Sequence, residues 1–166
     1  MRPAVQFAGM ADRQEWVLLA YRMPREPSSP RITVWRRLRK LGAVQVVDGL
    51  VALPADARTK EQLEWVADQA VEAGGEATVW LARLSSAKQE RELAARMAAE
   101  AAEAYQAVID EVAELRREPD GVQQRTLGRL RRELRRISQR DYFPPPARDT
   151  ATAAVNGLAE LIGAGA

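Results

Sequence analysis

The dipeptide Asp48-Gly49 lies between two short apolar runs, residues 43–47 and 50–53. Asp-Gly in such a position is typical of a tight turn between neighbouring antiparallel strands, because glycine adopts a positive φ at little cost. Pro54 then ends the second run, since proline cannot donate a hydrogen bond to a neighbouring strand. The sequence therefore predicts a β-hairpin, and the rest of the first half of the chain has to be arranged around it.

Two further apolar runs of strand length lie on either side of this hairpin, at residues 16–23 and 77–84. The segments that separate them from the hairpin have the apolar spacing of amphipathic helices. The resulting order over residues 15–84 is strand, helix, strand, strand, helix, strand. This order predicts an α+β fold with a ferredoxin-like βαββαβ sheet module, a four-stranded antiparallel sheet with both helices on one face.

Local signals predict where the two helices of this module begin. Ser29 followed by Pro30 predicts the start of the first helix, because a hydroxyl caps free N–H groups and proline suits a first turn. Thr59 and Gln62 have the spacing of a capping box, which predicts the start of the second helix.

The rest of the chain, residues 85–166, is predicted to be helical. Apolar positions recur at steps of three and four over residues 86–117, 122–139 and 149–162. The residues expected to face inward on the second and third of these segments are Leu127, Leu130, Leu134 and Ile137, and Val155, Leu158, Leu161 and Ile162. We therefore expect a helical, three-helix extension, packed with the sheet module or on a partner. Residues 1–14 lack the apolar core of a signal peptide and are expected to form a loose leader.

The sequence contains neither cysteine nor histidine. Disulfide bonds, thiol chemistry and the commonest general base and metal ligand are therefore excluded. No phosphate-binding glycine loop, no metal-spaced ligand set and no convincing carboxylate pair stands out. No apolar run approaches the roughly 18 residues that a membrane helix needs. We expect a cytoplasmic protein without catalytic residues, cofactor, metal or membrane contact.

Basic residues are concentrated on one side of two predicted helices. The two sets are Arg36, Arg37, Arg39 and Lys40, and Arg125, Arg129, Arg132 and Arg136. Like charges at such spacings repel, so phosphate binding is one reason to keep them. Pairing with the acidic residues of the long helix, simple solvation, and docking of another protein are the alternatives. The residue pattern by itself leaves these interpretations open.

Three more arginines, Arg22, Arg25 and Arg31, surround the loop that leads into the first helix. Because a helix N-terminus favours anions, an oxyanion such as chromate or sulfate is expected here if the chain binds one. Glu26 lies among these arginines, and an ion pair with them is the simplest interpretation of this carboxylate.

All four tryptophans, Trp16, Trp35, Trp65 and Trp80, lie on predicted strands or helices. We expect them to pack in the core. Stacking on nucleic-acid bases, the alternative, requires exposed rings on the open face of the sheet.

Several segments together resemble the amino-terminal domain of the ChrB family of chromate-resistance regulatory proteins. The resemblance rests on Trp16 to Pro27, Arg31, Val34 to Ala43, Leu53-Pro54, Thr59 to Trp65, Gly74 to Ala77, and Arg140-Asp141-Tyr142-Phe143. It implies a DNA-binding transcriptional regulator of a chromate-efflux operon that responds to chromate. Longer members carry a second, carboxy-terminal domain. This chain ends where that domain would begin, so we expect a regulator that lacks it.

The first 84 residues also resemble, more distantly, the ferredoxin-like module of phenylacetate-pathway repressors and small CRISPR-associated nucleases. These nucleases place a metal-binding aspartate at the end of the first strand, where this chain has Tyr21-Arg22-Met23. Arginine does not bind Mg²⁺, which prefers oxygen ligands, so a nuclease is disfavoured. The two leading expectations are a DNA-binding regulator and a protein-protein adaptor that binds no nucleic acid. A homodimer or a partner protein is compatible with both.

Overall fold

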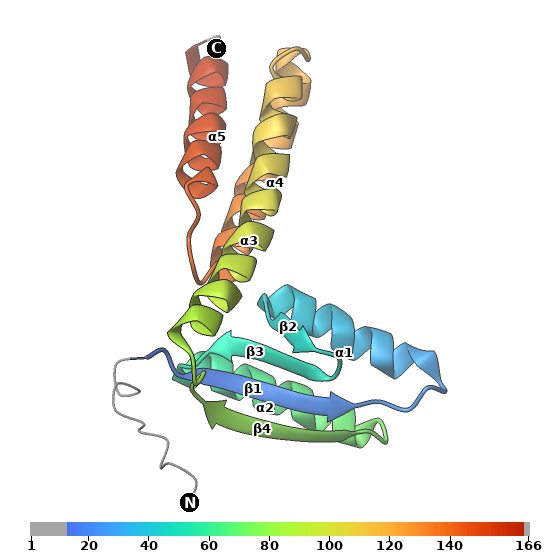
Figure 1. Ribbon diagram of the computed structural model, residues 1–166. Coiled ribbons are helices and arrows are strands. Elements are labelled where there is room, and N and C mark those ends of the chain that lie inside the picture. The colour runs from blue at the N-terminus through green and yellow to red at the C-terminus, as the bar shows by residue number, and fades with distance from the viewer. Residues whose placement is uncertain (1–12, 165–166) are drawn as a thin grey trace, which may run out of the picture. The chain divides into compact units, whose positions relative to one another are not determined.

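The computed structural model describes residues 13–164, so most of the expected leader, residues 1–14, lies outside the described residues. The chain divides into two compact units, with the boundary between Leu93 and Ala94, inside the long helix α3 (Ala87–Leu115). The first unit holds a sheet and two helices, and the second is helical (Figure 1). The described part of the chain is thus a mixed α/β protein with a four-stranded antiparallel sheet and five helices.

The sheet has the strand order β2-β3-β1-β4. Its strands are β1 (Trp16–Arg22), β2 (Val44–Val47), β3 (Leu50–Pro54) and β4 (Glu76–Ala82). The central strand β1 is antiparallel to both of its neighbours, β3 and β4. Val17 and Leu19 of β1 are fully buried because they point to the face that α1 (Ser28–Leu41) and α2 (Ala57–Glu72) cover (Figure 1). Leu18, which alternates with them, faces the other side.

The predicted hairpin at Asp48-Gly49 is confirmed, with β2 and β3 paired on either side of the turn. Gly49 has φ 75°, and a Cβ built on it would lie 2.7 Å from the carbonyl oxygen of Tyr21. The carbonyl oxygen of Gly49 also accepts a hydrogen bond of 2.8 Å from the backbone N–H of Tyr21. The turn therefore requires glycine twice, for its backbone conformation and for its contact with β1.

Both helix starts differ from those predicted. Helix α1 begins at Ser28, after Pro27, and no side chain caps it. In α2 the capping box is formed by Asp56 and Thr59, because the Asp56 carboxylate accepts from the Thr59 N–H and the Thr59 hydroxyl accepts from the Asp56 N–H. Thr59 was the correct residue, but it stands at the third helical position and Gln62 takes no part.

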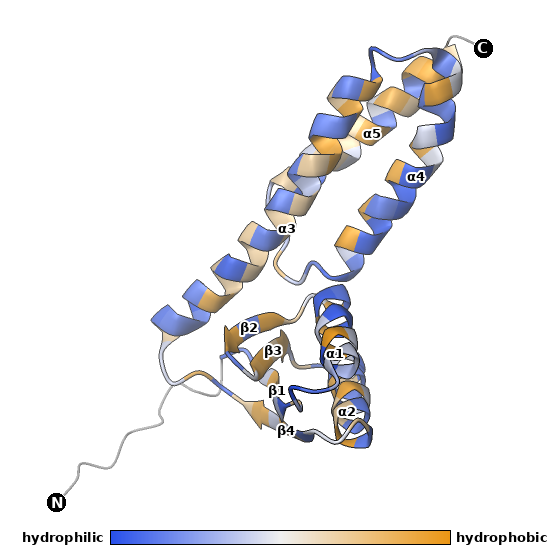
Figure 2. Ribbon diagram, turned by 90° about the vertical axis from the view of Figure 1, so that its right-hand side faces the viewer, coloured by the Kyte–Doolittle hydropathy of each residue, from blue (hydrophilic) through white to orange (hydrophobic). Residues whose placement is uncertain are grey.

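The second unit is a bundle of the rest of α3, α4 (Asp120–Gln139) and α5 (Ala147–Ala164). Most of α4 is hydrophilic, interrupted by hydrophobic turns (Figure 2). The apolar residues expected to face inward on α4, Leu127, Leu130 and Ile137, are buried, and Leu134 packs against them. Leu161 of α5, expected inward, is exposed, and Tyr105 of α3 is an additional buried member of this core.

Candidate nucleic-acid interface

Most of the basic residues of α1 lie on the side of the helix that faces away from its core contacts. Val34 and Leu38 are buried and hold the helix to its unit. The predicted basic residues Arg36, Arg39 and Lys40 are exposed, and Arg37 is half-buried. Among residues 13–164, none of these four groups has an acidic oxygen within 4.0 Å. This basic face of α1 therefore carries charge that the described residues do not neutralise by direct pairing.

Exposed aromatic rings accompany this basic face. Trp35 is 53% exposed, and the guanidinium carbon of Arg39 lies 5.8 Å from the centre of its ring, a cation–π contact. Trp65 of α2, 59% exposed, and Arg37 line the same surface hollow. The expectation of core packing is confirmed for Trp16 and wrong for the other three tryptophans. Amphipathic spacing misplaced Trp35 because its position is at the edge of the apolar arc, where a large ring reaches solvent.

The fourth tryptophan is exposed on the other side of the sheet. Trp80 of β4 is directly opposite Leu18 of β1, so both point away from the helix-covered face. Its ring is 58% exposed, and the indole N–H donates to the Thr78 hydroxyl at 2.8 Å. Trp80 thus meets the exposure that base stacking requires, on a face separate from the basic face of α1.

The four predicted arginines of α4, among the six in this helix, are also exposed, but two of these four are paired. Arg129 forms an ion pair with Glu111 of α3, and Arg136 lies 3.5 Å from Glu133 of its own helix. Arg125 and Arg132 have no acidic oxygen within 4.0 Å among the described residues. The alternative of internal pairing with the acidic long helix holds for Arg129 alone, and that pair is solvent-accessible.

The three arginines expected to bind an oxyanion have different surroundings. The Arg22 guanidinium is 2.6 Å from the Glu76 carboxylate, its register neighbour on β4. Arg25 is exposed on the loop, and Arg31 lines a cavity against β1. Among residues 13–164, Glu26 forms none of the ion pairs expected with the neighbouring arginines. Arg22 forms its ion pair with Glu76.

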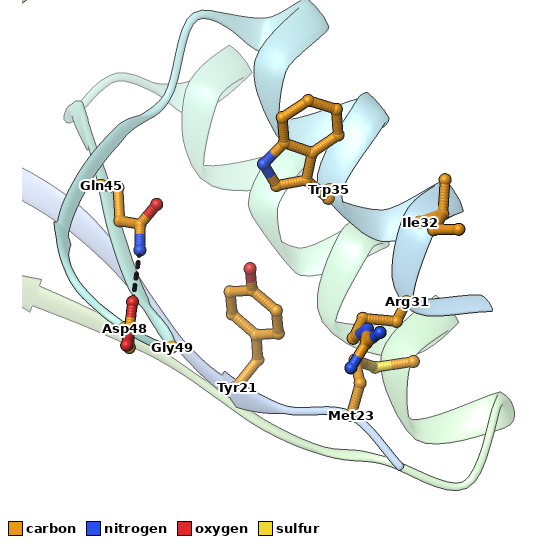
Figure 3. A pocket seen from close by; sticks show the side chains of 8 residues that line it. All are labelled: Tyr21, Met23, Arg31, Ile32, Trp35, Gln45, Asp48 and Gly49. Carbon is orange, nitrogen blue, oxygen red and sulfur yellow. Dashed lines mark hydrogen bonds between the residues drawn. The ribbon is translucent and has the colours of Figure 1, made fainter. Parts of the chain in front are cut away.

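The cavity that Arg31 lines has a volume of about 350 Å³. Its other lining residues come from β1, α1 and the β2–β3 hairpin: Tyr21, Met23, Ile32, Trp35, Gln45, Asp48 and Gly49 (Figure 3). The Gln45 side-chain amide donates to the Asp48 carboxylate at 2.9 Å. Burial raises the pKa of the Tyr21 phenol, and the nearby Asp48 carboxylate raises it further. The phenol therefore stays protonated at neutral pH and is a hydrogen-bond donor.

A second tyrosine lies in the helical unit. The Tyr105 hydroxyl donates to Asp141 Oδ2 at 3.0 Å, and burial together with this bond raises the pKa of Tyr105 to about 12. Asp141 Oδ1 is buried and has no hydrogen-bond partner among the described residues. The sequence signal that could have drawn attention here is the segment Arg140 to Phe143, since Tyr105 itself occupies an ordinary core position.

The chain thus joins an antiparallel α/β unit to a three-helix unit, and each carries an arginine-rich helix surface. The family described as "Protein ChrB, N-terminal" matches residues 31–163. This match covers most of the chain, so the protein belongs to that family, which relates it to the regulators of chromate resistance. The match confirms the resemblance seen in the sequence.

No curated protein and no solved structure gives a significant match. Within residues 13–164, no helix is both long and apolar enough to span a membrane.

Proposed function

We propose that the protein is a cytoplasmic, DNA-binding transcriptional regulator of the chromate-resistance type, and not an enzyme. The observation that supports this best is the basic face of α1, three of whose four cations are exposed, beside the exposed ring of Trp35. Arginine and lysine side chains bind phosphates, and contact with the duplex releases condensed counterions. The family to which the chain belongs agrees with this assignment.

We propose that the sheet unit is of the ferredoxin-like type. Its elements run in the order β1, α1, β2, β3, α2, β4, and β1 stands between β3 and β4 in the sheet. We take this unit as the framework that presents the basic face of α1. The arginines of α4 are a second, weaker set of phosphate ligands, because two of them already have acidic partners.

A protein-protein adaptor is the second candidate, and the surroundings of Trp65 favour it. The hollow beside this exposed ring is also lined by Asp68 and Glu72. Two carboxylates repel a phosphate backbone, whereas they suit a basic or apolar surface of another protein. In this alternative, the arginines of α1 bind acidic groups of a partner and DNA is not involved.

The experiment that separates the two candidates is binding to the DNA upstream of the protein's own gene over a series of salt concentrations. For a regulator, log affinity falls linearly with log salt, with a slope of about −0.9 for each phosphate contact. Titration with chromate in the same assay tests whether this chain responds to the oxyanion. An absence of DNA binding at low salt by folded protein would contradict the regulator and leave the adaptor.

A further inference from the structure

The cavity between β1, α1 and the hairpin combines one flat aromatic wall with separated polar groups. Trp35 and Ile32 of α1 form its apolar side, and Tyr21 stands between Arg31 and the Asp48 end (Figure 3). A volume of about 350 Å³ is at the lower end of the range in which proteins bind small molecules. The basic face of α1, which carries the proposed DNA contact, contributes none of the lining residues.

The polar groups of the cavity have a defined hydrogen-bond pattern. The Tyr21 phenol lines the cavity and is protonated at neutral pH, as an ordinary phenol is, so it offers a donor; burial and Asp48 raise its pKa further. Asp48 is an acceptor, and its Oδ1 accepts a hydrogen bond of 2.9 Å from the exposed Gln45 amide. A ligand that binds both residues needs an acceptor for the phenol and a donor for the carboxylate, and a pair of adjacent donors suits the two oxygens of Asp48.

The Watson–Crick edge of guanine carries this pattern, a carbonyl oxygen followed by a ring N–H and an amino group. Its carbonyl oxygen accepts from the Tyr21 hydroxyl, and its two N–H groups donate to the Asp48 carboxylate. Adenine has no such pair of adjacent donors, and cytosine and thymine present at most one donor group at this edge. A planar purine also suits the indole of Trp35, because bases stack on aromatic side chains.

Arg31 provides a site for the charged end of such a ligand. Its guanidinium lines the cavity away from Asp48, in the first turns of α1 (Figure 3). Arginine binds phosphate with two parallel hydrogen bonds, and the N-terminal end of a helix adds a favourable field.

We propose that this cavity binds a guanine nucleotide, with the base at Trp35, Tyr21 and Asp48 and the phosphate at Arg31. The nucleotide is either free in solution or an unpaired guanosine within a nucleic-acid strand, because both present the same base edge and phosphate. The inference goes beyond the proposed function, since a free nucleotide can occupy the cavity whether or not α1 binds a DNA duplex.

Calorimetric titration of the whole chain with GMP, IMP, AMP and guanosine tests the proposal. IMP lacks only the amino group, so it should bind roughly tenfold more weakly than GMP, and AMP more weakly still. Guanosine should bind more weakly because it has no phosphate for Arg31. Asp48→Asn should abolish the preference for GMP over IMP, and Arg31→Gln should remove the advantage of GMP over guanosine.

Two tryptophan variants are matched controls for stacking. Trp35→Leu should weaken GMP binding about tenfold, in line with the value of one stacked base, while Trp80→Leu on the other face of the sheet should leave it unchanged. Both rings are more than half exposed, so neither substitution empties the core. Unchanged melting temperatures establish that the variants fold.

A thymine oligonucleotide with one central guanine, hypoxanthine or adenine distinguishes the two sources of the base. If the protein prefers guanine over hypoxanthine only in the oligonucleotide, the cavity binds an unpaired guanosine of a strand. If it prefers GMP over IMP but does not distinguish the oligonucleotides, the cavity binds a free nucleotide. If neither probe distinguishes guanine from hypoxanthine, or if Asp48→Asn leaves the distinction intact, the inference is wrong. If Asp48→Asn still binds duplex DNA, the proposed DNA-binding function holds independently of the nucleotide proposal.

Discussion

The two arginine-rich helices, α1 and α4, share a sequence pattern and differ in their surroundings. Both alternate apolar residues with basic ones at helical spacing. In α4 most of the apolar set is buried, whereas in α1 Val34 and Leu38 are buried and Trp35 is exposed. The basic face of α1 has no acidic partner within 4.0 Å among the described residues and lies beside exposed aromatic rings. In α4, Glu111 and Glu133 pair with Arg129 and Arg136. The same pattern thus leaves more unpaired charge on α1 than on α4.

The largest expected effect on stability comes from Gly49, in the β2–β3 turn of the unit that contains α1. Gly49→Ala should lower the free energy of unfolding of the sheet unit by about 2–3 kcal/mol, because alanine is strained at positive φ and its Cβ would meet the Tyr21 carbonyl oxygen. Thermal or denaturant unfolding measures this change.

The matched control is Gly121→Ala in the first turn of α4, where an added Cβ meets nothing within 4 Å. Alanine should stabilise this helix by up to about 1 kcal/mol, since it loses less conformational entropy than glycine. Equal effects of the two substitutions would contradict the tight contact between the hairpin and β1.

The second prediction removes the exposed charges of α1. In the variant Arg36→Gln, Arg39→Gln, Lys40→Gln, the plot of log affinity for DNA against log salt should become shallower by about 2.7, from three contacts at about 0.9 each. Folding should persist, because Val34 and Leu38 still hold the helix. An unchanged slope in a folded variant would exclude α1 as the contact surface.

The third prediction divides the α4 arginines by their partners. The double variant of the unpaired residues, Arg125→Gln with Arg132→Gln, should reduce the slope by up to about 1.8. The double variant Arg129→Gln with Arg136→Gln should reduce it less, since these guanidinium groups have acidic partners. Salt-dependent binding of both proteins measures the difference. Identical slopes would show that exposed ion pairs do not keep these arginines from phosphate.

The smallest effect is expected at Tyr105, which joins α3 to Asp141 at the end of α4. Tyr105→Phe should lower the free energy of unfolding by about 1–2 kcal/mol, because it removes a hydrogen bond to a carboxylate. The folded-state pKa of about 12 lies above the ordinary value of 10.0. The protonated phenol therefore stabilises the fold fully below pH 10, and this contribution is lost as the pH rises towards 12.

A pH series of unfolding experiments on wild type and Tyr105→Phe measures this contribution. The stability difference should be constant through neutral pH and shrink above pH 10, where the wild type begins to lose its advantage. A difference that does not change at high pH would mean that the hydroxyl has no role beyond packing.

The order of strands and helices could be predicted because its signals are local. The Asp48-Gly49 turn and the α4 leucines each depend on residues close to them in sequence, and both were placed correctly. Thr59 was recognised as part of a capping box, but its partner Asp56 was missed. Both residues can cap a helix, and the sequence alone did not show that Asp56 is the last residue before the first turn.

The candidate site was less accessible to sequence reasoning because it depends on partners far apart in the chain. Arg22 pairs with Glu76, which follows it by 54 positions, so no local pattern excluded the expected pairing with Glu26. The exposed tryptophans were missed for a related reason, since helical spacing gives the direction of a side chain but not what covers it. The cavity residues Tyr21, Gln45 and Asp48 come together only when β1 pairs with the hairpin.

The hydrogen bond between the Tyr21 N–H and the Gly49 carbonyl has a consequence for how this protein can diversify. This bond joins β1 to the hairpin beside Tyr21 through main-chain atoms, whereas Asp48 and Gln45 contribute side chains from the hairpin. Substitutions at these two positions change the groups that meet a ligand without displacing the phenol. In the proposed nucleotide site, changes of the hairpin side chains would therefore alter ligand preference while the main-chain bond to β1 is kept.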